Sequence, residues 1–175
     1  VGSEMCIRDR HRLHGDDAQQ SPHYGRLVND RAFGRVTSYL AQGKILVGGR
    51  TDPSDRYIEP TLLAEVDPGA PVMQEEIFGP VLPMLPFDDI GEAVALINDR
   101  EKPLALYYFG PKKTGREVLL HTSSGGACIN DTIMQIANDR LPFGGVGNSG
   151  MGRYHGHDSF DAFSLRRGVV ESPAR

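Results

Sequence analysis

The sequence predicts an α/β fold in which strands form a parallel sheet. Apolar extended segments alternate with amphipathic segments from residue 81 to residue 129, at lengths typical of strand–helix–strand units with right-handed crossovers. The 175 residues contain 39% hydrophobic and 24% charged side chains, close to the globular norm, so the chain should fold around a core. The 21 glycines and 12 prolines exceed average usage and indicate many turns.

The first part of the chain predicts one amphipathic helix followed by two strands. Apolar residues recur at helical spacing over residues 28–40, and Gly43 is a suitable C-terminal stop. Residues 44–47 predict a strand. Residues 57–63 predict a second strand, which Pro60 interrupts or confines to the edge of a sheet.

The second part of the chain is more regular and then changes character. It predicts, in order, a strand, a helix, a strand, a helix and a strand, at residues 81–87, 88–100, 104–109, 112–122 and 127–129. Residues 141–156 contain six glycines and cannot form a regular helix or strand. Residues 164–172 return to a β-like pattern around Val169 and Val170, too short for a core of their own, so we expect them to pair with another segment.

The N-terminal residues and the overall charge exclude several classes of protein. Residues 1–20 are polar and lack periodicity, so we expect a mobile segment, and residues 1–10 also resemble vector or sequencing-adapter read-through. The formal net charge of −4 and the absence of a basic patch disfavour nucleic-acid binding. No apolar run approaches the roughly 18 residues that a membrane span needs. Cys6 and Cys128 read as reduced thiols, and a cytoplasmic location is expected.

Two short motifs each have a functional and a structural interpretation. Residues 145–150 match G-x-G-x-x-G, which cradles a pyrophosphate when a strand precedes it and a helix follows. That context is missing here, so we favour a close-packed loop. In residues 74–80 the two acids, Glu75 and Glu76, indicate either a solvated turn or a carboxylate that accepts hydrogen bonds from a ligand diol. In the second case Phe78 would form a flat wall for a ring.

Several segments carry, in order along the chain, the motifs of one protein family. They are residues 57–61, 72–80, 100–107, 122–126, 130–131, 141–152, 154–156 and 159–160. Together they resemble the aldehyde dehydrogenase superfamily, and within it the class-3-like branch that includes fatty-aldehyde and coniferyl-aldehyde dehydrogenases. The similarity extends from about residue 21 to residue 170.

The resemblance implies oxidation of an aldehyde to a carboxylic acid with NAD or NADP. In this family a cysteine forms a thiohemiacetal with the aldehyde, hydride passes to nicotinamide, and a glutamate-activated water hydrolyses the thioester. The resemblance assigns two cofactor contacts, Glu76 to the nicotinamide ribose and Phe78 to the nicotinamide side. It assigns three residues to the substrate pocket, namely Ile133, Phe143 and His155, and it makes Asn130 a scaffold residue. It implies no metal site.

The resemblance also implies that the chain is the C-terminal part of a longer enzyme. The nucleophilic cysteine, the general-base glutamate, the oxyanion asparagine and the dinucleotide-binding half would lie upstream, so we expect the fragment alone to be inactive. Residues 21–163 would be a partial catalytic domain, and residues 164–175 an oligomerisation strand and tail that serves a homodimer of the full-length enzyme. Two alternatives stay open: a non-catalytic binding or interaction module, and another nicotinamide enzyme that uses residues 145–150 as a phosphate cradle.

Overall fold

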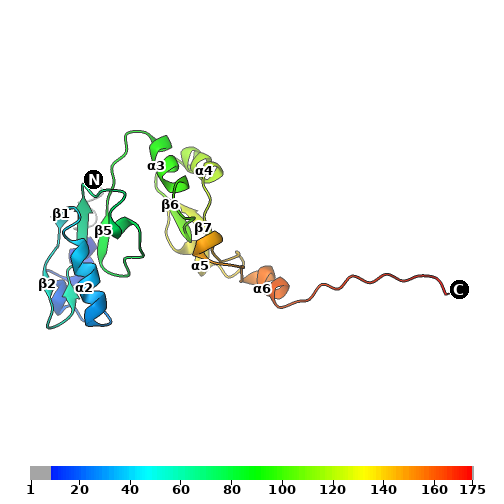
Figure 1. The fold of residues 1–175 in the computed structure, drawn as a ribbon, viewed down its shortest axis with the longest axis horizontal. Helices are drawn as coiled ribbons and strands as arrows, with labels where there is room; N and C mark the ends of the chain where they lie inside the picture. Colours follow the sequence, from blue (N-terminus) through cyan, green and yellow to red (C-terminus); the bar gives the residue numbers. More distant parts are fainter. Residues whose placement is uncertain (1–8, 175) are drawn as a thin grey trace. The chain divides into compact units, whose positions relative to one another are not determined.

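The computed structural model describes residues 9–174, which form an α/β structure (Figure 1). Cys6 and most of the first ten residues, whose natural origin the sequence puts in question, lie outside the described residues. The chain divides into two compact units, residues 1–86 and 87–175, and each is described by itself. We call them unit 1 and unit 2.

In its described residues, unit 1 contains a three-stranded mixed sheet, a two-stranded ribbon, the ten-residue helix α2 and a helical stretch at residues 9–14. Its elements are, in order, η1 (Ala18–Gln20), α2 (Asp30–Tyr39), β1 (Lys44–Val47), β2 (Thr51–Asp52), β3 (Tyr57–Ile58), β4 (Thr61–Ala64), η2 (Pro71–Met73) and β5 (Val81–Pro83). In the sheet, β4 lies between β1, to which it is antiparallel, and β5, to which it is parallel. The strands β2 and β3 form the antiparallel ribbon.

The core of unit 1 lies between α2 and the sheet. The helix begins at the cap residue Asn29, whose side chain accepts a hydrogen bond from the backbone N–H of Ala32. Val36 and Tyr39 on its inner face are buried with Leu63 and with other apolar residues of the strands. Burial of this apolar surface is the main stabilising contribution to unit 1.

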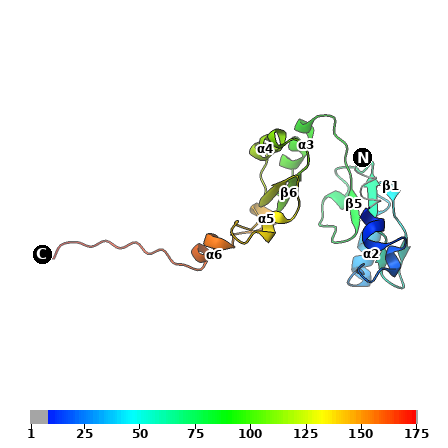
Figure 2. The ribbon, with the colours of Figure 1, turned by 180° about the vertical axis from the view of Figure 1, so that it is seen from behind.

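Unit 2 is built around a parallel pair of strands. Its elements are, in order, α3 (Ile90–Asn98), β6 (Ala105–Tyr108), α4 (Lys112–His121), β7 (Gly126–Ile129), α5 (Met134–Ala137), η3 (Gly147–Ser149) and α6 (Gly156–Ala162). The pair β6 and β7 has α4 as its crossover, which is the predicted strand–helix–strand unit. Figure 2 shows α3 and α4 beside each other at these strands.

The predicted parallel pairing is confirmed, but the strands divide differently from the expectation. The strand expected over residues 81–87 ends at Pro83, and it pairs with β4 rather than with β6 across the intervening helix. Proline has no backbone N–H to donate to a neighbouring strand, so Pro83 and Pro86 prevent β5 from extending further. The described chain therefore has parallel pairs in two separate sheets.

Both ends of the chain differ in local structure from the sequence pattern. Residues 9–14 are helical and Ala18–Gln20 form a 3-10 turn, although residues 1–20 lack periodicity. Arg10 pairs with Glu59 at 2.6 Å, which ties the helical residues to the segment between β3 and β4. Residues 164–174 contain no strand and run on beyond α6 (Figures 1 and 2), so their pairing with another chain stays a prediction. Within residues 9–174 no helix has the length and apolar character that a membrane span requires.

Candidate functional site

The acidic turn of unit 1 is held by side chains from α2. The guanidinium of Arg35 donates from Nη1 to the hydroxyl of Tyr39 at 2.8 Å, and this hydroxyl donates in turn to Oε2 of Glu75 at 3.1 Å. Arg35 and Glu75 also form an ion pair at 3.8 Å. The carboxylate of Glu75 is therefore already engaged by two side chains of α2.

The other acid, Glu76, has a carboxylate that is available to a ligand. Its side chain is exposed, and within the described part of the chain no hydrogen bond or ion pair engages its carboxylate oxygens. Its backbone is fixed, because the carbonyl oxygens of Glu76 and Ile77 accept hydrogen bonds from Arg35 at 3.1 and 2.9 Å. An ionised carboxylate has two acceptor oxygens, which suit the two hydroxyls of a diol.

Phe78 projects from this turn with its ring in solvent. Its side chain is 76% exposed and its φ angle is +46°, in the left-handed region that non-glycine residues rarely adopt. The residues on either side are anchored: Ile77 packs against the core, and Gly79 lies so close to Val36 that a Cβ there would come within 2.8 Å of Cγ1. The anchoring fixes the turn while it leaves the phenyl ring accessible.

Unit 2 brings Phe143 and His155 together with a third ring. The backbones of Phe143 and Tyr154 exchange two hydrogen bonds, of 2.8 and 2.9 Å. The ring of His155 stacks on that of Phe143 with centroids 5.9 Å apart, and meets the ring of Tyr154 edge-on at 4.6 Å. The backbone N–H of His155 donates to Oγ of Ser159 at 2.7 Å, and its buried Nδ1 has no partner within the described residues. The three rings form one aromatic wall.

Ile133 and Asn130 lie on the loop between β7 and α5. Ile133 is 61% exposed and has a φ angle of +65°. Asn130 exchanges two hydrogen bonds with the backbone of Gly110, at 2.7 and 2.9 Å, which agrees with a scaffold role. The structure thus brings Phe143 and His155 of the expected pocket residues into contact, and it places Ile133 on an exposed loop.

The glycine-rich segment is a close-packed loop, as the sequence favoured. A Cβ at Gly144 would lie 2.2 Å from the carbonyl oxygen of Gly152, and one at Gly125 would lie 2.3 Å from that of Gly144. The G-x-G-x-x-G stretch contains the 3-10 turn Gly147–Ser149, and no α-helix starts there. A phosphate cradle needs a helix N-terminus at this position. Of the glycines in the motif, Gly145 serves close backbone packing, because a Cβ there would lie 2.1 Å from the carbonyl oxygen of Ser149, whereas Gly147 has open space around it and a φ angle of +62°.

Three other titratable side chains of the described residues, those of Cys128, Asp55 and Tyr24, take part in structural contacts. The thiol of Cys128, half-buried on β7, donates to Oε1 of Gln135 at 2.9 Å. Hydrogen bonds from Arg26 and Gln19 hold the pKa of Asp55 below its ordinary value, and burial raises the pKa of Tyr24 well above its usual range. Residues 9–174 contain no cluster of three or more His, Cys, Asp or Glu that could hold a metal ion.

The roles of Glu76 and Phe78 stay predictions, and the sequence did not indicate the residues that hold their turn. Arg35 and Tyr39 lie four residues apart on α2, so their mutual contact has a sequence signal. Their contact with a turn about 40 residues later has none, because it depends on the packing of α2 in unit 1.

Comparison with known proteins places the chain among enzymes of one kind. A family model described as the aldehyde dehydrogenase family matches residues 9–169. The dimeric NADP-preferring aldehyde dehydrogenase of Rattus norvegicus is 54% identical over 159 residues, which is 90% of this chain and 35% of the relative. A substrate-bound structure of Staphylococcus aureus AldH superposes with a TM-score of 0.87 at 45% identity, covering 98% of this chain and 39% of that one. A Mycobacterium tuberculosis aldehyde dehydrogenase complexed with NAD+ superposes with a TM-score of 0.74 at 28% identity, covering 92% and 35%.

Proposed function

The chain belongs to the aldehyde dehydrogenase family, and on this premise we propose that it serves the oxidation of an aldehyde to a carboxylic acid with NAD or NADP. The observation that carries the proposal is the free carboxylate of Glu76 beside the exposed ring of Phe78, on a turn that unit 1 holds in place. The chain spans about 35% of the length of the rat relative, so the activity proposed is that of a whole enzyme.

The two turn residues have distinct roles in this proposal. The nicotinamide cofactor, when bound, supplies the acceptor for hydride. The Glu76 carboxylate accepts hydrogen bonds from the two ribose hydroxyls and so sets the position of the sugar. The ring of Phe78 gives the nicotinamide a flat apolar surface and excludes water from that side. These residues orient the cofactor and transfer no proton.

The aromatic wall of unit 2 is assigned to the substrate. Phe143 and His155 present stacked rings, which suit an apolar or aromatic aldehyde. Ile133, exposed on a neighbouring loop, is proposed to add a further apolar contact in the complete enzyme. Unit 1 thus carries the proposed cofactor contacts, and unit 2 the proposed substrate contacts.

We assign the nucleophile to neither cysteine of this chain. Cys128 lies on a strand with its thiol hydrogen-bonded to Gln135, and no His, Lys or Arg is described in contact with that thiol. The resemblance places Cys6 outside the nucleophile motif. On this proposal the chain alone has no dehydrogenase activity.

The tail is proposed to join two copies of the complete enzyme. Residues 164–174 have no strand partner within the described chain, and Val169 and Val170 are 74% and 92% exposed. The rat relative is named a dimeric enzyme. We propose that this segment pairs with a second copy in a homodimer, and that the enzyme works in the cytoplasm.

A chimaeric enzyme tests the cofactor assignment. In it, residues 9–169 of this chain replace the aligned stretch of the rat dehydrogenase, which the 54% identity makes a conservative exchange. Because a carboxamide keeps the shape of the side chain but loses its charge, Glu76→Gln is expected to weaken NADP binding about tenfold. Titration of NADP by fluorescence, together with steady-state kinetics, measures the effect.

The matched control is Glu65→Gln, which alters an exposed glutamate of the same unit whose side chain pairs, among residues 9–174, only with Lys44, at 3.2 Å. We expect its NADP affinity to equal that of the parent chimaera. Equal affinity of the Glu76→Gln chimaera and the parent would overturn the assignment. A folded chimaera without activity would favour the alternative of a non-catalytic module.

A further inference from the structure

Arg35 occupies a central position in the hydrogen bonds of the acidic turn. Its guanidinium reaches two consecutive backbone carbonyls, those of Glu76 and Ile77, at 3.1 and 2.9 Å. It also donates to the Tyr39 hydroxyl and lies 3.8 Å from the Glu75 carboxylate. A side chain of α2 therefore fixes the backbone of the turn from outside the turn.

The chemistry of arginine suits this role better than that of any other side chain. Its planar guanidinium presents several N–H donors in a fixed fork, so it can hold two neighbouring carbonyls and a hydroxyl together. The guanidinium also lies 5.5 Å from the centre of the Tyr39 ring, where a cation–π attraction helps to hold its positive charge in place. Lysine has a single ammonium on a flexible stem and cannot hold the same set of acceptors in one plane.

The turn needs an external restraint because its own conformation is unfavourable. Phe78 has a positive φ angle, which is strained for a residue with a large side chain. The side chains of Glu75, Glu76 and Phe78 are exposed, so they add little packing to hold the backbone. Without Arg35, the carbonyls of Glu76 and Ile77 are free to turn to water and the backbone to relax.

The same contacts separate the roles of the two acids. Arg35 and Tyr39 engage the carboxylate of Glu75, and Arg35 engages only the backbone of Glu76. The guanidinium is therefore paired with Glu75, and the carboxylate oxygens of Glu76 stay free of these contacts. A ligand that approaches this turn meets one carboxylate at a fixed position.

We propose that Arg35 is a positioning residue: by holding the carbonyls of Glu76 and Ile77 it aims the Glu76 carboxylate and the Phe78 ring at the nicotinamide riboside. This inference rests on the proposed function of Glu76 and Phe78. According to this inference, α2 controls the affinity for the cofactor, although none of its groups contacts the cofactor in the proposed function.

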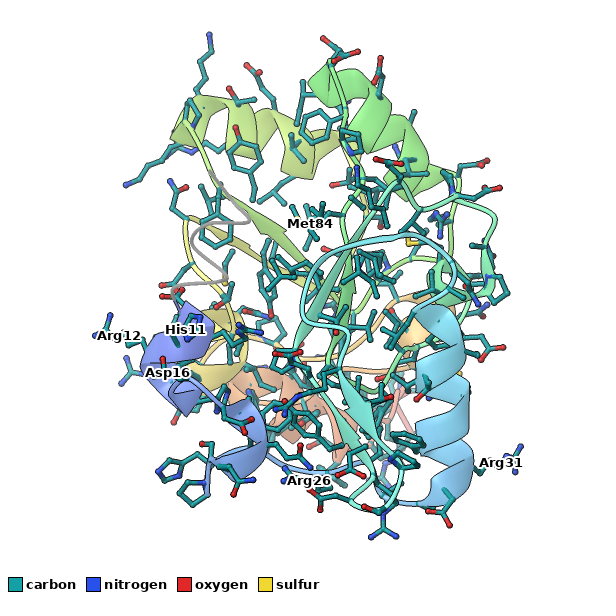
Figure 3. All side chains as sticks on the ribbon, turned by 90° about the vertical axis from the view of Figure 1, so that its left-hand side faces the viewer. His11, Arg12, Asp16, Arg26, Arg31 and Met84 are labelled. Atoms are coloured by element: carbon teal, nitrogen blue, oxygen red, sulfur yellow. The ribbon has the colours of Figure 1, made fainter. Side chains whose placement is uncertain are left out.

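The test compares Arg35→Met and Arg35→Lys with a control, Arg31→Met. Arg31 is exposed one turn earlier on the same helix, and Figure 3 shows its side chain pointing away from α2. The first measurement is amide hydrogen exchange at residues 77–79 in the 175-residue chain itself. The second is NADP affinity and kcat in the chimaeric enzyme.

We expect faster exchange at residues 77–79 and roughly tenfold weaker NADP binding for Arg35→Met. The lysine variant should recover part of both effects, and Arg31→Met should match the parent. A KM for NADP that rises more than kcat falls would agree with lost positioning. A lower melting temperature with unchanged exchange at residues 77–79 and unchanged NADP affinity would overturn the inference.

The two readouts also separate this inference from the proposed function. If Arg35→Met speeds exchange in the turn but Glu76→Gln leaves NADP affinity unchanged, the restraint on the turn is real and the cofactor assignment is wrong. If Glu76→Gln weakens NADP binding and Arg35→Met changes neither readout, the cofactor assignment stands and the positioning role is wrong.

Discussion

Units 1 and 2 carry comparable numbers of residues but bury their apolar side chains very differently. Among the described residues, the buried apolar side chains of unit 1 are Ala18, Val36, Tyr39, Tyr57, Ile58, Leu62, Leu63, Val66, Val72 and Val81, and that of unit 2 is Val118. Unit 2 instead exposes large apolar side chains on most of its elements, among them Leu120 of α4 and Phe160 of α6 at 81% and 69%. Unit 1 has its own hydrophobic core, and unit 2 has little of one.

The difference teaches how each unit holds its functional residues. In unit 1 the acidic turn rests on a packed helix through side-chain hydrogen bonds. In unit 2 the aromatic wall rests on a loop whose glycines allow backbone to pack on backbone. We therefore expect unit 1 to unfold as a cooperative structure, and unit 2 to depend on backbone fit and on cover for its exposed apolar surface.

The largest expected effect is the loss of a core side chain in unit 1. Leu63 is fully buried on β4, so Leu63→Ala should lower the free energy of unfolding of unit 1 by about 2–5 kcal/mol. Urea titration followed by amide resonances of each unit measures this change separately for the two units.

Leu120→Ala is the counterpart in unit 2. This side chain is 81% exposed on α4, so its truncation should change stability by no more than about 0.5 kcal/mol. Equal losses for Leu63→Ala and Leu120→Ala would contradict the contrast between the two units.

An intermediate effect is expected where a glycine is replaced in the close-packed loop. A Cβ at Gly125 would lie 2.3 Å from the carbonyl oxygen of Gly144 and 2.6 Å from that of Leu104, so Gly125→Ala should destabilise unit 2 by about 1–3 kcal/mol. Loss of the ring-current shifts of Phe143 and His155 in NMR spectra would show that the aromatic wall has moved.

Gly34→Ala is the matched substitution in unit 1. A Cβ there meets nothing within 4 Å and the residue is inside α2, so alanine should raise stability by about 0.5–1 kcal/mol. Opposite signs for the two glycine substitutions would sharpen the comparison. A stabilising Gly125→Ala would show that the loop does not depend on close backbone contact.

The smallest expected effect is a loss of order in part of unit 1 at acid pH. Hydrogen bonds from Ser54 and Gln19 lower the pKa of Asp52, and those from Arg26 and Gln19 lower the pKa of Asp55. The pKa of each carboxyl group therefore lies below its ordinary value of about 3.9. The contribution of these carboxylates to folding stability is fully present above about pH 4 and is lost as the pH falls below it.

Tyrosine signals follow this acid transition, since the chain has no tryptophan. Tyr57 contacts Arg26 through its ring, so its NMR resonances should shift below pH 4. Asp55→Asn should flatten this pH dependence, because the amide does not titrate. An unchanged profile in that variant would assign the transition to other carboxylates.

The sequence predicted most elements because their signals are local. The helix expected over residues 88–100 is α3 (Ile90–Asn98), and the interruption expected at Pro60 separates β3 from β4. A family motif assigns Glu76 and Phe78 to the cofactor, which stays a prediction, and the structure adds that Tyr39 engages the carboxylate of Glu75. Each of these predictions depends on a few neighbouring residues.

The remainder depends on contacts between distant residues. Nothing near residue 81 indicates that β5 pairs with β4, and nothing near Arg35 indicates that it reaches the carbonyl of Ile77. The short helices after residue 130 have weak periodicity, so the sequence gives no helix prediction for α5 and α6. Such features follow from packing, which a local pattern does not contain.

The positive φ angle of Phe78 has a consequence for engineering. Glycine adopts this backbone conformation without strain, so Phe78→Gly is a replacement that a search for thermostability would favour at this exposed position. The same replacement removes the ring proposed to face the nicotinamide. Selection for heat resistance and selection for catalysis therefore favour different residues at position 78. An aromatic residue at this position throughout the family would indicate that selection for catalysis was the stronger of the two.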